Sequence, residues 1–169
     1  MDELDAGAVA PRDRRLLAAL GPRKLDLART RFGGAVTLLV DPEHTAWTRT
    51  RLGPASTLVV SQMLVLDEDP HAARAAARAP LGFLSTVGGY ASAFSRMGFD
   101  EREIRELSDR LVDATFAWGG VDAVTARLRE QVAAGADHVV VSPVPSAGGP
   151  GELEVAARLA PAVRAPDPA

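Results

Sequence analysis

The sequence predicts an α/β fold in which helices cover a mostly parallel sheet. Four apolar runs, at 16–20, 35–40, 57–66 and 139–141, alternate along the chain with helical patterns. The last run, Val139–Val141, is uninterrupted, as in strands buried on both faces of a parallel sheet. A closed eight-stranded barrel needs about 250 residues. The 169 residues therefore predict half of such a barrel or a small open sheet.

The clearest unit is a helix, a tight turn and the fourth strand. Val121, Val124, Leu128 and Val132 recur at spacings of three and four residues, which predicts one buried helix face. Gly135 supplies the left-handed residue that ends such a helix.

Prolines and capping residues predict where the earlier helices begin. Pro22 is expected to open a helix over 23–31, since proline is favoured at the first helical position. Asp41-Pro42 starts a helix that closes at Gly53-Pro54, and Asp69-Pro70 opens one that runs up to Ala79.

Three further helices are predicted in the second half of the chain. Asp100 and Glu103 form a pattern typical of a capping box. Ser108 is expected to cap a helix that continues through Trp118. The range 152–164 predicts a last amphipathic helix.

Composition excludes several classes of protein. A net charge of -3 and the lack of basic runs exclude an electrostatic nucleic-acid binder. The absence of cysteine removes disulfides and thiolate chemistry. Residues 1–12 are acidic and predict a flexible leader rather than a secretory signal. Since no apolar run approaches about 20 residues, we expect a cytoplasmic protein without a membrane partner.

The best candidate site is the junction after the first strand. Ligands of parallel sheets gather at the carboxyl ends of the strands. Gly21 allows close approach of the backbone, and the helix behind Pro22 presents free N–H groups beside Arg23 and Lys24. This pattern predicts an anion site for phosphate. The alternative is an ordinary strand–helix turn with two solvated cations.

The remaining residues that could carry chemistry give weaker evidence for a site. His44, His71 and His138 are not paired at ligand spacing, so surface or capping roles are expected and no metal site is predicted. No nucleophile elbow or catalytic acid or base is recognisable. Tyr90 follows two glycines and could either face a pocket or fill the core.

Several spaced segments together resemble the luciferase-like monooxygenase superfamily, and within it the branch that uses the deazaflavin coenzyme F420. The resemblance covers roughly residues 15–144 and corresponds to the C-terminal half of such an enzyme. Its segments are LAALGPRKLDLA (17–28), VDPEHT (40–45), MGFDEREI (97–104), SDRLVDATFAWG (108–119) and ARLREQVAAGADHVVV (126–141).

The resemblance implies a half TIM-type (β/α)8 barrel that contains the last four strands. It also implies an oxidoreductase or monooxygenase that transfers hydride to or from a small organic substrate through F420, with FMN as the alternative cofactor. We therefore expect the chain to divide into three segments: the leader at 1–12, the half-barrel at 13–145, and a Gly/Pro-rich connector with a terminal helix at 146–169. The implied cofactor-binding residues are Ala19, Leu20, Gly21, Pro22, Arg23 and Thr37.

The resemblance further implies that the chain forms a homodimer, or pairs with another chain, to complete the barrel, since open sheet edges are a liability. The alternative is a truncated, non-catalytic half-barrel that acts in self-association or in pairing with a partner chain. Two departures favour it. Val36-Thr37-Leu38 replaces a polar-aromatic trio of the relatives, and Val60-Ser61 replaces their Pro-Glu.

Overall fold

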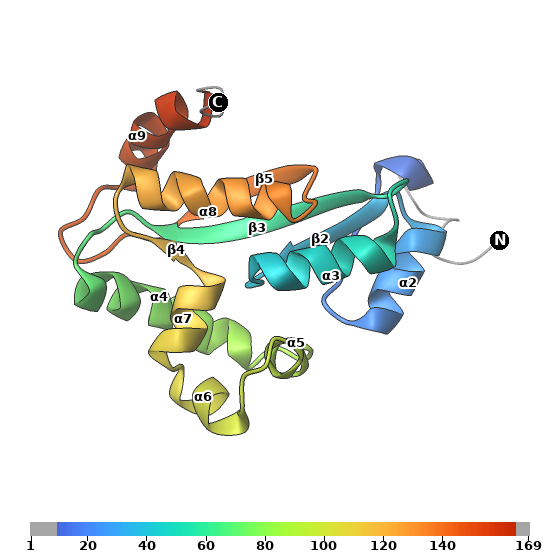
Figure 1. The fold of residues 1–169 in the computed structure, drawn as a ribbon, viewed down its shortest axis with the longest axis horizontal. Helices are drawn as coiled ribbons and strands as arrows, with labels where there is room; N and C mark the ends of the chain where they lie inside the picture. The colour runs from blue at the N-terminus through green and yellow to red at the C-terminus, as the bar shows by residue number, and fades with distance from the viewer. Residues whose placement is uncertain (1–9, 165–169) are drawn as a thin grey trace.

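The computed structural model describes residues 10–164 and shows a sheet in which every strand pair is parallel (Figure 1). Residues 1–9 of the expected leader, and residues 165–169, lie outside the described range; Arg12, the last residue of the leader, begins a 3₁₀ turn over Arg12–Arg14. The strands are β1 (Leu16–Ala18), β2 (Gly34–Leu38), β3 (Thr57–Val65), β4 (Ala117–Trp118) and β5 (His138–Pro143). The predicted α/β fold with parallel strands is confirmed.

Strand β3 is the centre of the sheet. Its first five residues pair with β2, which in turn pairs with β1. The overlapping segment from Val59 to Leu64 pairs with β5, so β2 and β5 lie on opposite edges of β3. The short β4 pairs with Leu64 and Val65 of β3, on the same edge as β2 but beyond the end of that strand. The four predicted runs therefore form one continuous sheet, in the order β1, β2, β3, β5.

Helices α2, α3 and α8 cover one face of this sheet. Strand residues Ala35, Leu58 and Val60 pack there against Leu25 of α2 and Leu52 of α3. The other helices lie beyond the carboxyl ends of the strands or beside α8 (Figure 1). The helices are α2 (Pro22–Arg31), α3 (Pro42–Leu52), α4 (Pro70–Ser85), α5 (Tyr90–Arg96), α6 (Glu101–Glu106), α7 (Asp109–Thr115), α8 (Val121–Ala133) and α9 (Glu152–Arg164).

The predicted helix starts are confirmed by their hydrogen bonds. Asp41 accepts from the backbone N–H of His44 at 2.7 Å, and Asp69 accepts from that of His71 at 2.9 Å. Asp100 and Glu103 form the complete capping box, and the Ser108 hydroxyl accepts from the N–H of Leu111.

Two predicted helix ends are wrong. Helix α4 does not stop at Ala79 but continues through Pro80 to Ser85. Leu81, in that extra segment, is fully buried, and its packing offsets the hydrogen bond that the proline removes. Helix α7 ends at Thr115, and Trp118 lies in β4 instead.

The buried face of α8 also differs from the prediction. Val132 is 56% exposed, whereas the neighbouring Gln131 is fully buried. A buried polar partner for Gln131 explains the difference, because Gln62 on β3 and Thr45 on α3 both hydrogen-bond to its amide. The left-handed Gly135 that was predicted to follow the helix is present, with φ 106°.

Strand β5 is not the strand buried on both faces that its sequence predicted. Val140 is 50% exposed and Val141 38% exposed. Two features of the packing explain this: among residues 10–164 β5 pairs with β3 alone and forms an edge, and Val140 lies on the face of the sheet that the helices leave uncovered.

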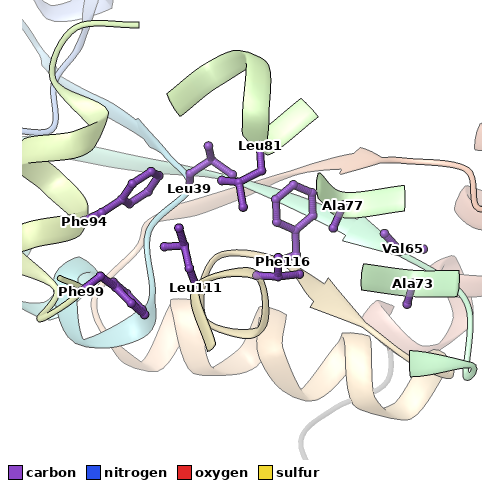
Figure 2. Close-up of a cluster of buried hydrophobic side chains, with 10 residues drawn as sticks. Leu39, Val65, Ala73, Ala77, Leu81, Phe94, Phe99, Leu111 and Phe116 are labelled. Atoms are coloured by element: carbon purple, nitrogen blue, oxygen red, sulfur yellow. The ribbon is translucent and has the colours of Figure 1, made fainter. Parts of the chain in front are cut away.

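A separate apolar core joins helices α4 to α7 to the carboxyl ends of the strands. Figure 2 shows Phe94, Leu111 and Phe116 converging on Leu81. All four side chains are at most 1% exposed. This core holds the segment between β3 and β4, which contains α4 to α7, against the sheet. It thereby places α5 near the carboxyl ends of β1 and β2.

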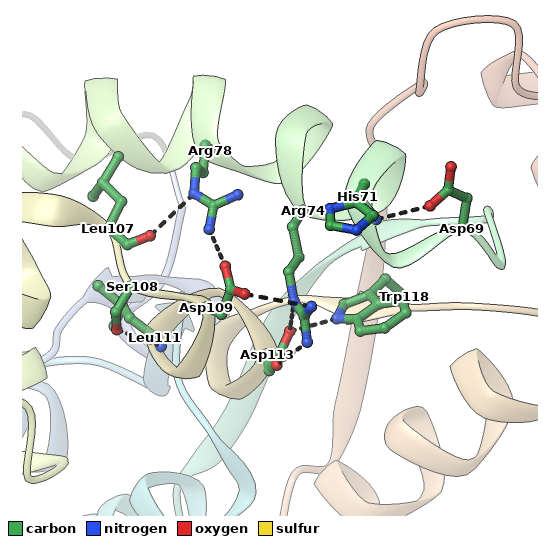
Figure 3. Close-up of polar contacts among 10 residues, drawn as sticks. All are labelled: Asp69, His71, Arg74, Arg78, Leu107, Ser108, Asp109, Leu111, Asp113 and Trp118. Atoms are coloured by element: carbon green, nitrogen blue, oxygen red, sulfur yellow. Dashed lines mark hydrogen bonds and ion pairs between the residues drawn. The ribbon is translucent and has the colours of Figure 1, made fainter.

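Asp109 and Asp113 lie one helical turn apart on α7, and both form ion pairs with arginines of α4 (Figure 3). Arg74 binds Asp113 through two hydrogen bonds of 2.9 and 2.7 Å, and Arg78 pairs with Asp109. The Trp118 indole also donates to Asp113, at 2.8 Å. These ion pairs join α4 to α7.

Acid is expected to weaken the α6–α7 corner through Glu103. Hydrogen bonds from Arg110, at 2.6 and 2.8 Å, and from the Asp100 N–H lower the pKa of Glu103 from 4.5 to about 2. Because the folded pKa lies below the unfolded value, this stabilisation is present above pH 4.5 and is lost as the pH falls toward 2. Urea unfolding should show a flatter pH dependence in this window for Glu103→Gln than for a Glu101→Gln control. Equal slopes for the two variants would contradict the assignment.

Within residues 10–164, no helix combines the length and the apolar character needed to cross a membrane.

Candidate functional site

A cavity of about 1010 Å³ lies at the carboxyl ends of β1 and β2. Its walls come from the turn between β1 and α2, from the sheet, and from the segment that joins α4 to α5. The structure brings together at this one cavity all six residues that the sequence predicted, namely Ala19, Leu20, Gly21, Pro22, Arg23 and Thr37.

Thr37 contributes to the wall in an unexpected way. Its strand partner is Val60, which packs in the helix-covered core, and Thr37 is only 2% exposed. Since side chains alternate along a strand, the Thr37 hydroxyl points toward the helices, where it has no hydrogen-bond partner among the described residues. The neighbours Val36 and Leu38 face the cavity instead.

The start of α2 supplies the polar end of the cavity. Gly21 is the N-cap and carries no side-chain cap, Pro22 occupies the first helical position, and the first turn holds no acidic residue. The N–H groups of Arg23 and Lys24 therefore have no intrahelical acceptor. With the positive end of the helix dipole and two cationic side chains, this turn favours an anion.

Arg96 of α5 is a third cation at this turn. Its Nη2 donates to the Leu20 carbonyl at 3.1 Å, and the same atom lies 3.6 Å from the position that a Cβ on Gly21 would occupy. Sequence reasoning missed Arg96 because it lies 76 positions after Leu20 and carries no local motif. Only the packing of α5 over the sheet brings it to the site.

His44 lies behind the same turn. The ring is buried, at 5% exposed, so the expected surface position is wrong for its side chain, although its backbone N–H is capped by Asp41. Burial lowers the pKa of His44; the Asp41 charge opposes this effect and Arg96 adds to it. A second cavity, of about 200 Å³, is shared by His44, Trp47 and Arg96 and adjoins the first through Arg96.

Tyr90 takes both of the positions that the sequence left open. It lines the cavity, and its ring packs on Phe94 with the centroids 6.0 Å apart. Burial raises the pKa of its phenol, so the hydroxyl stays protonated at neutral pH. The glycines before it, Gly88 and Gly89, complete this wall.

Elsewhere the sheet edge has a different character. A cavity of about 420 Å³ beyond β3 and β4 is lined by the carboxylates of Asp67 and Glu68 and by the guanidinium of Arg158, so its charges are mixed. No group of three or more histidine, aspartate or glutamate side chains converges on a metal position in the part of the chain that the structure describes.

Comparison with solved structures identifies the architecture. The coenzyme F420-dependent tetrahydromethanopterin reductase from Methanopyrus kandleri superposes with a TM-score of 0.65 at 17% identity, over 87% of this chain and 50% of that one. An F420-dependent secondary alcohol dehydrogenase in complex with an F420–acetone adduct gives a TM-score of 0.61 at 16% identity, over 88% of this chain and 48% of that one. The chain has the fold of about half of each of these enzymes, a parallel sheet with surrounding helices.

The half-barrel spans about half the length of each of these enzymes. No family model and no curated protein matches its sequence. At 16–17% identity the likeness concerns the fold. The fold agrees with the resemblance and with the partial barrel that the spaced sequence segments implied.

Proposed function

We propose that the half-barrel binds the phosphate-bearing part of coenzyme F420, with FMN as the alternative, and serves an oxidoreductase that acts on a small organic substrate. The observation that carries the proposal is the uncapped start of α2, where Arg23, Lys24 and Arg96 line one cavity at the carboxyl edge of a parallel sheet. Two enzymes with the same half-fold are F420-dependent by name, which supports the choice of cofactor.

Each part of the cavity has a role in this proposal. The backbone at Gly21 and the first-turn N–H groups hold phosphate oxygens, and the three cations neutralise their charge. Val36 and Leu38 offer an apolar surface to a ring system. The cofactor supplies the hydride chemistry when bound. None of the lining residues is assigned as a catalytic acid or base.

The sharpest test changes the charge at Gly21 while keeping the helix start. Gly21 has an extended backbone (φ −111°), so another residue fits there without strain. Gly21→Asp caps the helix but places a carboxylate where the phosphate would bind. We expect it to weaken F420 binding at least tenfold, about 1.4 kcal/mol, in a fluorescence titration. Thermal stability should stay equal or rise slightly.

Gly21→Asn is the matched control, because it caps the helix equally well and has nearly the same shape without the charge. It should retain most of the affinity. Equal losses in the two variants would point to steric blocking rather than an anion site. If the folded wild-type chain bound neither F420 nor FMN at high micromolar concentration, the proposal would be overturned for this chain.

A second candidate function is that of a non-catalytic half-barrel whose role is association with another chain. The aliphatic Val36 and Leu38 on the cavity wall favour it, since they offer no polar group to a ligand. The same titration separates the two candidates, because this one expects no binding of either cofactor.

A further inference from the structure

The sheet has two open edges. β1 pairs with β2 on one side, β5 pairs with β3 on the other, and among residues 10–164 no further strand joins either of them. Proteins usually blunt exposed edges with charges, prolines or bulges. Here the β5 edge carries Val140, 50% exposed, and Val141, 38% exposed, and the β1 edge carries Leu16, 40% exposed.

The face of the sheet that the helices leave uncovered is largely apolar. Pairing and alternation place on it Leu16 and Ala18 of β1, Val59 of β3 and Val140 of β5. Its polar groups include His138 at the start of β5 and the Ser61 and Ser142 hydroxyls, which lie 3.3 Å from each other. In a closed barrel this is the inward face, which layers of side chains fill.

We propose that a second copy of this chain covers this face, with β5 of each copy pairing in parallel with β1 of the other to close an eight-stranded barrel. Two sets of the four strands β1, β2, β3 and β5 give the required number. One two-fold axis along the barrel satisfies both edges at once, with identical contacts.

Charge and edge pairing both favour a second copy as the occupant. The strand residues on the uncovered face carry no aspartate, glutamate, lysine or arginine, so two copies would bring no like charges together there. A second copy also presents one open β1 edge and one open β5 edge of parallel strands, which match the two open edges described above.

Closure would also complete the candidate site. The cavity includes Val36, Leu38 and Ser61 among its lining residues, which belong to the uncovered face. Strands of the partner would wall this side and exclude water from it. The inference concerns assembly and does not rest on the identity of the cofactor, so either proposal can fail without the other.

The first test measures the mass of the purified chain by light scattering over a hundredfold dilution. We expect twice the chain mass and no larger species, because a closed barrel leaves no free edge. A folded monomer at all concentrations, judged by circular dichroism, would overturn the inference. Open-ended larger assemblies would overturn it as well.

A paired substitution locates the interface. Val140→Glu puts a charge on the open strand and should convert the dimer to a monomer. Leu153→Glu makes the same kind of change on α9, where Leu153 is 89% exposed, and should leave the dimer intact. The opposite pattern would place the interface on α9 and refute barrel closure.

Cross-linking keeps the test decisive if Val140→Glu fails to fold. The natural chain has no cysteine, so any disulfide reports an engineered pair. Cysteines at one of 16, 17 or 18 on one copy and at one of 138, 140 or 142 on the other should give a covalent dimer for at least one combination. Leu153→Cys paired with the same β1 positions should give none. Failure of every β1–β5 combination would contradict the proposed pairing.

Discussion

Gly34→Ala is expected to destabilise the protein by about 3 kcal/mol or more, the largest effect we predict for a single methyl group. A Cβ at Gly34 would lie 1.9 Å from the Thr57 carbonyl oxygen and 2.7 Å from its carbonyl carbon. Both atoms belong to the backbone of β3, so no side-chain rotation can relieve the clash. Because Gly34 pairs with Leu16 as well as Thr57, the shift would disturb three strands.

The measurement is urea unfolding followed by circular dichroism, or the yield of soluble protein if the variant does not fold. Gly88→Ala is the matched control, since no atom lies within 4 Å of a Cβ there and the backbone has no positive φ. It should change stability by less than about 0.5 kcal/mol. Similar losses in the two variants would show that the close contact at Gly34 is not what limits substitution.

Gln131→Met is expected to cost about 3–5 kcal/mol, since it leaves several buried polar groups without partners at once. The Gln131 Nε2 donates to the Val40 carbonyl and to Gln62 Oε1, both at 3.0 Å, while its Oε1 accepts from Thr45 at 2.7 Å. Gln131 and Thr45 are fully buried and Gln62 is 1% exposed. Water cannot replace the lost partners unless the core opens.

Val132→Gln, at the next position of α8, is the control, because Val132 is 56% exposed. It should be neutral within about 0.5 kcal/mol in chemical unfolding. The double variant Gln62→Met with Gln131→Met should cost less than the sum of the two single changes, since each removes a partner of the other. Strict additivity would show that the two amides do not form one network.

This network explains a feature of β3 that the sequence could not interpret. Gln62 interrupts an apolar run, and its Nε2 donates to the carbonyls of Met63 and Thr115. With Gln131 and Thr45 it ties the sheet to α3, α7 and α8. Apart from Met63, the bonded partners lie 53 to 91 positions apart, so neither spacing nor periodicity could pair them.

Local chemistry predicted the helix starts well because each depends on neighbouring residues. Asp41, Asp69, Asp100 and Ser108 cap helices within three positions. Helix ends and exposure were less predictable, since Pro80 and Val132 depend on what packs against them. The turn at Gly21 could be found from sequence for the same local reason, whereas its partner Arg96 could not.

The sequence by itself determined the alternation of strands and helices, the parallel sheet that follows from it, and the turn at Gly21 that opens a helix after β1, because these depend on periodicity, capping and backbone freedom over a few residues. Only the tertiary structure decided that β5 is an edge, that the Thr37 side chain turns away from the cavity, and that Arg96 reaches Leu20. Those outcomes depend on which distant segments lie side by side. Long-range packing sets that arrangement, and no local pattern encodes it.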